Sequence, residues 1–230
     1  MAAASADGAA FFDLDRTLIS SSSSLALAGS FRRRGLLSRR TLAQAAVAQL
    51  LFTRFGAGQS RVGQTAESAV EILRGLPVSQ LREIVDEAWD SVLRPLVYRE
   101  AAEAAADHAA GGERRFVVSA ALQEIVDAVA GGLGFEGGVG SRAEVVGGSY
   151  TGRLQRRLYG PAKAEALAEL AAAEGVDLSA STGYSDSHTD LAFLEAVGRP
   201  VAVNPDRALR RVAGDRGWPV VRFRTRLGSA

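Results

Sequence analysis

The stretch Ala9-Ala-Phe-Phe-Asp13-Leu-Asp15-Arg-Thr17-Leu18 decides the fold class. Its four apolar residues, 9–12, are enough for a short buried strand, and the carboxylates that follow mark the end of that strand. Asp13 and Asp15 are two residues apart, so their side chains begin on the same face of an extended chain. Two buried carboxylates at this distance require a cation or a shared proton. The alternative is a solvated acidic turn.

The rest of the chain alternates helix-like and strand-like segments after residue 95, as α/β proteins do. Residues 25–95 are instead rich in Ala and Leu at helical spacing. We therefore expect a Rossmann-like, mostly parallel sheet with helices on both faces, formed by residues 7–20 and 96–226, and an inserted helical domain at 21–95. The expected helices are 36–55, 62–74, 79–93 with Ser79 as its cap, 98–110, 121–129, 161–174, 190–197 and 205–213, and the expected strands are 9–12, 115–119, 180–184, 200–203 and 219–223, with a hairpin of 143–146 and 150–154.

A second acidic pair, Asp186 and Asp190, follows the expected strand that ends near Tyr184. Ligands of open parallel sheets bind at the carboxyl ends of strands, where both acidic pairs lie. The chain has no cysteine, and oxygen ligands without cysteine favour Mg²⁺ over zinc or copper. Helix capping by Asp190 or Thr189 is the alternative explanation.

Ser119 and Lys163 are candidates for binding an anion. Ser119 ends an expected strand before a helix that begins near Ala121, so its hydroxyl and the nearby N–H groups could hold an oxyanion, although a capping serine needs no ligand. Lys163 is the only lysine among 27 basic residues. It lies in the first turn of a helix, where a cation gains nothing from the helix dipole, so its presence indicates a need for a compact positive charge. We expect His108 to lie at the surface.

These residues, in this order, resemble the four motifs of the haloacid dehalogenase superfamily. The stretch 11–18 is similar to its D-x-D-x-T signature, Ser119 to its second motif, Lys163 to its third, and 186–190 to its fourth. The helical stretch after the first strand resembles the C1 cap of that superfamily. The segment 183–207 resembles the subfamily IB phosphatases related to phosphoserine phosphatase.

The resemblance implies a phosphatase that works through an aspartyl-phosphate. Asp13 would be the nucleophile, and Asp15 would protonate the leaving oxygen and then activate water. A carboxylate at position 15 separates phosphatases of this superfamily from its dehalogenases. The implied Mg²⁺ ligands are Asp13, the main-chain carbonyl of Asp15 and Asp186; the phosphate contacts are Thr17, Ser119, Ala120 and Lys163; Asp190 would orient Lys163; and the substrate contacts are Arg16, Ser22, His188 and Thr189.

The substrate is less well defined by the sequence. Phosphoserine phosphatases carry a glutamate shortly after the first motif, where this chain has serines at 20–24. We expect a small metabolite phosphate, which is phosphoserine-like or a sugar, polyol or amino-alcohol phosphate. The alternatives are a lysophospholipid-type phosphate phosphatase, a phosphotransferase, and a non-catalytic binding protein of the same fold. The lipid alternative depends on eight arginines, with no acidic residue, between Asp15 and Glu67: Arg16, Arg32, Arg33, Arg34, Arg39, Arg40, Arg54 and Arg61.

Composition limits the partners. The chain has 230 residues, a net charge of +1 and a pI of about 8.2, which gives no electrostatic reason to expect a nucleic acid partner. It has no apparent secretion signal and no apolar stretch of bilayer-spanning length, so we expect a cytoplasmic protein. Contact of the arginine-rich insert with a membrane surface stays open, and so does the oligomeric state.

Overall fold

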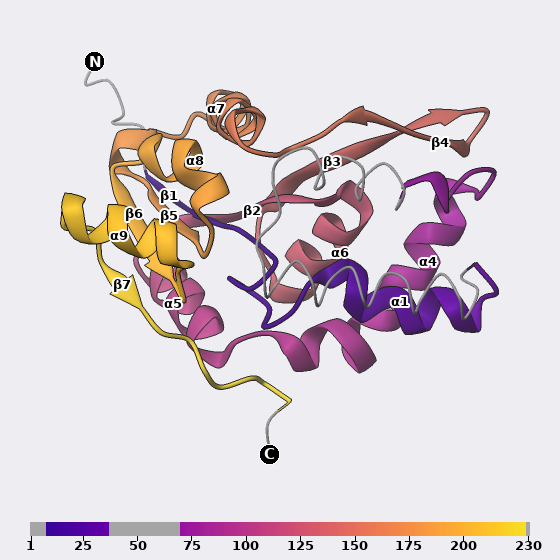
Figure 1. Cartoon of the computed structure of the whole chain (residues 1–230), viewed down its shortest axis with the longest axis horizontal. Coiled ribbons are helices and arrows are strands. Elements are labelled where there is room, and N and C mark those ends of the chain that lie inside the picture. The colour runs from indigo at the N-terminus through magenta and orange to yellow at the C-terminus, as the bar shows by residue number, and fades with distance from the viewer. Residues whose placement is uncertain (1–7, 37–69, 229–230) are drawn as a thin grey trace.

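The computed structural model describes residues 8–36 and 70–228. A seven-stranded sheet in the order β4-β3-β2-β1-β5-β6-β7 runs through its centre (Figure 1). The strands are β1 Ala9–Phe12, β2 Arg114–Leu122, β3 Gly137–Val146, β4 Ser149–Arg156, β5 Thr182–Ser185, β6 Arg199–Val203 and β7 Val220–Val221. Strand β4 is antiparallel to β3, and the other neighbouring pairs are parallel. The predicted mostly parallel α/β fold is confirmed.

Strand β1 separates two hydrophobic cores. Ala10 and Phe12 belong to one core, and Ala9 and Phe11 belong to the other. All four residues are fully buried, as expected for a parallel strand that is covered on both faces. The first core is covered by α5 (Arg99–Ala110) and α6 (Gln123–Leu133), and the second by α7 (Pro161–Glu174), α8 (Leu191–Glu195) and α9 (Arg207–Arg216).

The described parts of the predicted insert pack against the first core. They include α1 (Ser23–Arg33) and α4 (Val78–Ala88), followed by a π-helical turn, η1 (Trp89–Leu93), and a 3₁₀ turn, η2 (Arg94–Leu96). Most of the predicted helices 36–55 and 62–74 lies outside the described residues, so the boundaries of the insert stay a prediction. Within residues 8–36 and 70–228, no helix is both long and apolar enough to cross a membrane.

Several predicted element ends are wrong; β3, for example, begins at Gly137 rather than at residue 143. Strand β2 continues through Leu122, because it pairs with β3 again at Ser141 after a register shift, so the following helix begins at Gln123 rather than near Ala121. Helix α4 begins after Pro77, whose fixed φ suits a helix start, and Ser79 therefore lies inside the helix and is not its cap.

The C-terminal segment completes a second, smaller set of paired stretches. Main-chain hydrogen bonds join 18–20 to 96–98, through Ser20 N to Leu96 O at 2.9 Å and Tyr98 N to Leu18 O at 2.9 Å. Residues 224–228 pair with the other side of 95–99, through Leu227 N to Val97 O at 2.9 Å. Strand β7 is shorter than predicted because the chain after it leaves the main sheet for this pairing.

Candidate active site

The ends of three neighbouring strands bring most of the predicted site residues to one edge of the sheet. Phe12 of β1 is in register with Val117 of β2 and Tyr184 of β5. Asp13 therefore follows β1 at the level where Asp186 follows β5, and Asp13 N donates to Tyr184 O at 2.9 Å. Since carboxyl ends of parallel strands bind ligands in folds of this kind, this edge is the candidate active site.

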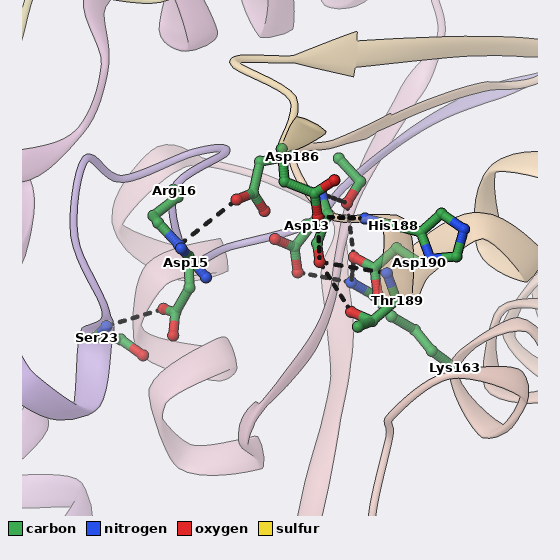
Figure 2. Close-up of polar contacts among 12 residues, drawn as sticks. Asp13, Asp15, Arg16, Ser23, Lys163, Asp186, His188, Thr189 and Asp190 are labelled. Atoms are coloured by element: carbon green, nitrogen blue, oxygen red, sulfur yellow. Dashed lines mark hydrogen bonds and ion pairs between the residues drawn. The ribbon is translucent and has the colours of Figure 1, made fainter. Parts of the chain in front are cut away.

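Lys163 joins two buried carboxylates at this edge. Its Nζ lies 2.6 Å from Asp13 Oδ1 and 2.6 Å from Asp190 Oδ2 (Figure 2). The side chain of Lys163 is 2% exposed, and its ammonium also lies 5.0 Å from the centre of the Phe193 ring. Burial alone would lower the pKa of Lys163, but the attraction of Asp13 and Asp190 outweighs it and raises that pKa. The lysine is therefore a fixed positive charge inside the site.

Asp13 and Asp186 repel each other when both are ionised. Burial raises the pKa of Asp13 to about 6 despite the opposing effect of Lys163. Burial and the nearby charge of Asp13 raise the pKa of Asp186 to about 8. Arg16 Nε is 3.5 Å from Asp186 Oδ2, and about half of the Arg16 side chain is exposed. A further cation between the two carboxylates would remove their mutual repulsion.

The donor atoms here fit a hard divalent cation. Carboxylates of Asp13 and Asp186 and the main-chain carbonyl of Asp15 are oxygen ligands, which Mg²⁺ prefers. This predicted set has two acidic side chains, and in the part of the chain that the structure describes no three His, Cys, Asp or Glu side chains group together as a metal site. The repulsion between ionised Asp13 and Asp186 is the structural observation that favours a cation.

The predicted anion contacts differ in their surroundings. The Thr17 side chain is fully buried, and its hydroxyl has no hydrogen-bond partner among the described residues. A buried hydroxyl without a partner is costly, which indicates a site for an acceptor that comes from outside. Ser119 is 2% exposed and accepts a hydrogen bond from Ala121 N at 3.2 Å. Ser119 lies within β2 and does not cap α6, and Ala120 is exposed beside it.

Asp15 points away from Lys163 and toward the start of α1 (Figure 2). Ser23 N donates to Asp15 Oδ1 at 2.8 Å, so the carboxylate lies at the positive end of that helix. Burial raises the pKa of Asp15, and the hydrogen bond from Ser23 opposes this. Ser22 is the N-cap residue of α1, without a capping bond from its hydroxyl.

The acidic loop 186–190 does not have the arrangement expected if Asp190 served as a helix cap. Asp190 precedes α8 but makes no capping bond, because its Oδ2 accepts from Lys163 and from the hydroxyl of Ser185 at 2.6 Å. The Thr189 hydroxyl lies 3.0 Å from the Ser187 hydroxyl at the surface. The ring of His188 lies to the side of the buried cluster in Figure 2. The structure thus joins Asp13, Lys163 and Asp190 by direct contacts, and the predicted substrate contact Arg16 lies against Asp186.

The prediction that His108 lies at the surface is wrong. Its side chain is 15% exposed, its Nδ1 pairs with Glu113, and its Nε2 lies 2.7 Å from the hydroxyl of Tyr184. The Tyr184 ring stacks on Phe12, with ring centres 4.4 Å apart. His108 is partly buried because α5 packs on the same core as Phe12, which an Ala-rich helix alone does not reveal.

Four residues beside the site were not among those singled out from the sequence: Ser23, Ser185, Phe193 and Asp206. Ser185 directly precedes Asp186, and Asp206 is the N-cap of α9, where an Asp before a helix is a recognisable signal. For Phe193 and Ser23, the sequence carries no signal, because their roles depend on packing between distant segments.

Comparisons with known proteins bear on the family and the fold. A family model described as haloacid dehalogenase-like hydrolase matches residues 10–195. The chain is 45% identical over 217 residues to the inhibition of morphological differentiation protein of Streptomyces azureus, covering 94% of this chain and 78% of that protein. It is 44% identical to a probable phosphatase of Mycobacterium tuberculosis, with 94% and 75% covered.

A protein of the same species named phosphoserine phosphatase is 34% identical over 218 residues, with 94% of this chain and 71% of that protein covered. Among solved structures, a protein of unknown function from Bordetella pertussis has a TM-score of 0.81 and 27% identity, and the match covers 94% of this chain and 99% of that one.

Proposed function

The chain belongs to the haloacid dehalogenase-like hydrolase family, and we propose that it is a Mg²⁺-dependent phosphomonoester hydrolase that works through an aspartyl-phosphate. The predicted family is confirmed, and so is the prediction of an enzyme of the phosphatase class, which relatives at 44% and 34% identity carry in their names. What we propose beyond this class is the cation, the covalent intermediate and the substrate.

One observation carries the proposal: the Asp13 carboxylate is held 2.6 Å from the buried ammonium of Lys163 at the edge where Asp186 follows β5. A carboxylate that is buried and fixed by one ion pair is oriented for attack with its other oxygen. The hydroxyl of Thr17, which has no hydrogen-bond partner within residues 8–36 and 70–228, and the buried hydroxyl of Ser119 supply donors for the phosphoryl oxygens. Together these groups favour chemistry on an anion at this edge.

In the proposed reaction, an oxygen of Asp13 attacks phosphorus and the bond to the leaving oxygen breaks. Lys163 offsets the negative charge shared by Asp13 and the phosphoryl group, and Asp190, which accepts from the Ser185 hydroxyl, holds the ammonium in place. Asp13 and Asp186, with the carbonyl of Asp15, would hold Mg²⁺, which when bound neutralises part of the charge on the phosphoryl group. Water then attacks phosphorus and releases Asp13 and phosphate.

Asp15 is proposed as the group that gives a proton to the leaving oxygen and later takes one from water. Burial raises its pKa, which favours the protonated form that a general acid requires. In this structure Asp15 accepts from Ser23 N at 2.8 Å. Ser23 is the first residue of α1, so the orientation of this carboxylate depends on where that helix begins.

The proposed substrate is a small metabolite phosphate. The relative named phosphoserine phosphatase supports a small phosphomonoester as the class. Serines occupy 20–24, and Ser22 offers a neutral hydroxyl where an amino group would prefer a carboxylate. Phosphoserine is therefore one candidate beside sugar, polyol and amino-alcohol phosphates. The proposed site of action is the cytoplasm.

Phosphate release from a panel of these esters, with Mg²⁺ and with EDTA, tests the proposal. We expect metal-dependent release by the wild-type protein and, in Asp13→Asn, a loss of about a thousandfold or more, because the amide is not a nucleophile. Circular dichroism of the variant should match that of the wild type. Release that persists in EDTA, or in Asp13→Asn, would contradict the mechanism.

A further inference from the structure

The loop after β6 is connected to the acidic loop 186–190 by an aspartate outside the four motifs. Asp206 N donates to Asp186 O at 2.9 Å, and Asp206 Oδ2 accepts from His188 N at 2.9 Å. The Ser187 hydroxyl lies 3.5 Å from the same carboxylate oxygen. Asp206 thus bonds to the main chain on both sides of Ser187, once through its own main-chain N and once through its carboxylate. We call these two bonds the Asp206 clamp.

The clamp joins the acidic loop to a rigid element. The second carboxylate oxygen of Asp206, Oδ1, accepts from Leu209 N at 2.8 Å and caps α9. Leu209 and Ala213 of that helix are fully buried in the second core. Both carboxylate oxygens of Asp206 therefore accept hydrogen bonds, Oδ1 from the helix α9 and Oδ2 from the acidic loop.

The position of the clamp matters because the acidic loop carries Asp186 at one end and Asp190 at the other. Asp186 directly precedes the clamped peptide groups, and its carboxylate faces Arg16. Asp190, at the other end of the loop, holds Lys163. The hydrogen bonds within the loop join its own atoms, such as Thr189 N to Ser187 Oγ at 3.3 Å and Asp190 N to Ser187 O at 3.0 Å. The clamp adds a support for Asp186 from outside the loop.

We infer that Asp206 is a positioning residue that holds the Asp186 carboxylate where it can bind a divalent cation. It acts through the main chain of the acidic loop and touches neither substrate nor cation. The inference rests on the proposed Mg²⁺ dependence for its second readout, and the first readout is independent of any cation.

Asp206→Ser separates the two roles of this side chain. Serine is as good a helix N-cap as aspartate, so the bond to Leu209 N can be kept, but its single oxygen cannot also reach His188 N. Asp177→Ser is the matched control, because Asp177 caps the 3₁₀ turn Leu178–Ala180 (η3) through Ser179 N at 2.8 Å and makes no bond to the acidic loop. Both variants lose one carboxylate at a cap.

The first readout is amide hydrogen exchange by NMR without added cation. We expect the His188 amide to exchange about threefold to tenfold faster in Asp206→Ser, which is the loss of one hydrogen bond, while amides of α9 exchange as in the wild type. Asp177→Ser should leave the His188 amide unchanged. Equal exchange at His188 in Asp206→Ser and the wild type would overturn the inference.

The second readout is the Kd of Mg²⁺ from calorimetric titration. We expect Asp206→Ser to bind Mg²⁺ about threefold to tenfold more weakly than the wild type and Asp177→Ser to bind it equally well. Unchanged affinity in Asp206→Ser would overturn the inference. Absence of Mg²⁺ binding in the wild type would instead contradict the proposed cation dependence, so the two failures are distinguishable.

Discussion

The ammonium of Lys163 and the carboxylate of Asp13 come from positions 150 residues apart in the chain and lie 2.6 Å from each other, both almost fully buried. Asp190 completes the arrangement at the same distance from Lys163. Two buried carboxylates with one ammonium between them leave a net negative charge. Lys163 and Asp13 therefore form a structural ion pair, and the two carboxylates with their one ammonium still carry a net negative charge.

Replacing Lys163 by methionine should damage both stability and turnover. The change leaves Asp13 and Asp190 buried without their shared cation, which costs about 3–5 kcal/mol. For a chain of this size, this corresponds to a fall in Tm of about 6–20 °C, measured by differential scanning calorimetry. The double variant Lys163→Met with Asp190→Asn, which removes one stranded charge, should recover part of that loss. A single variant as stable as the wild type would show that the pair is not formed.

Asp15→Asn should slow phosphate release according to the leaving group. The amide cannot give a proton, so esters of poor leaving groups such as aliphatic alcohols should lose about 100-fold to 10,000-fold in kcat. p-Nitrophenyl phosphate, whose leaving group needs no proton, should lose much less in the phosphoryl transfer step. This step is followed by the burst of p-nitrophenolate in rapid mixing. Equal losses for both kinds of ester would count against Asp15 as the acid.

Glu100 should stabilise the C-terminal segment in a pH-dependent way. Burial acts to raise the pKa of Glu100, but hydrogen bonds from Arg224 N and Thr225 N outweigh it and hold that pKa below its usual 4.5. A group whose pKa is lowered by folding stabilises the folded protein above its unfolded pKa, and this contribution is lost as the pH falls through the folded pKa.

We therefore expect Glu100→Gln to lower the Tm near neutral pH by about 2–4 °C, which corresponds to about 1 kcal/mol. The Tm values of variant and wild type should converge as the pH is lowered below 4.5 and through the lowered pKa of Glu100 in the folded protein. Thermal melts across this range give the comparison. A difference that is constant over the whole range would show that the carboxylate charge is not what holds Arg224 and Thr225.

Two adjacent glycines in α6 should respond oppositely to alanine. A Cβ on Gly132 would lie 2.1 Å from Cε2 of Trp89, whereas a Cβ on Gly131 would meet no described residue within 4 Å. Gly131→Ala should stabilise the protein by about 1 kcal/mol through helix propensity. Gly132→Ala should destabilise it by about 1–3 kcal/mol, because the ring must move. Urea unfolding measures both, and the same sign for both would contradict the packing of Trp89 on α6.

The sequence predicted the parts of this fold that depend on local patterns. The buried strand 9–12, the hairpin and the acidic strand ends follow from apolar runs, glycine pairs and the position of charged residues. Element ends that depend on pairing with distant strands were not predictable in this way, and β2 is the example, because its last residues are extended only where β3 meets them again at Ser141.

The same limit applies to the candidate site. Asp13, Asp186 and Lys163 are conspicuous in the sequence as charged residues at strand ends and as a lone lysine. Asp206 is an ordinary helix cap until the acidic loop is seen beside it. His108 is a further example, because the Ala-rich pattern of its helix gives no sign that this histidine is partly buried and pairs with Glu113 and Tyr184.

The position of β1 in the middle of the sheet has a consequence for biosynthesis. The strand is made first, yet its two neighbours are completed only when the ribosome has passed residues 122 and 185. The stretch 18–20 pairs with 96–98, whose other side pairs with 224–228 only after those residues are made. A nascent chain therefore carries the exposed apolar segment Ala9–Phe12 until β2 and β5 have been made, and a ribosome-associated chaperone that binds short apolar segments has this one available during that time.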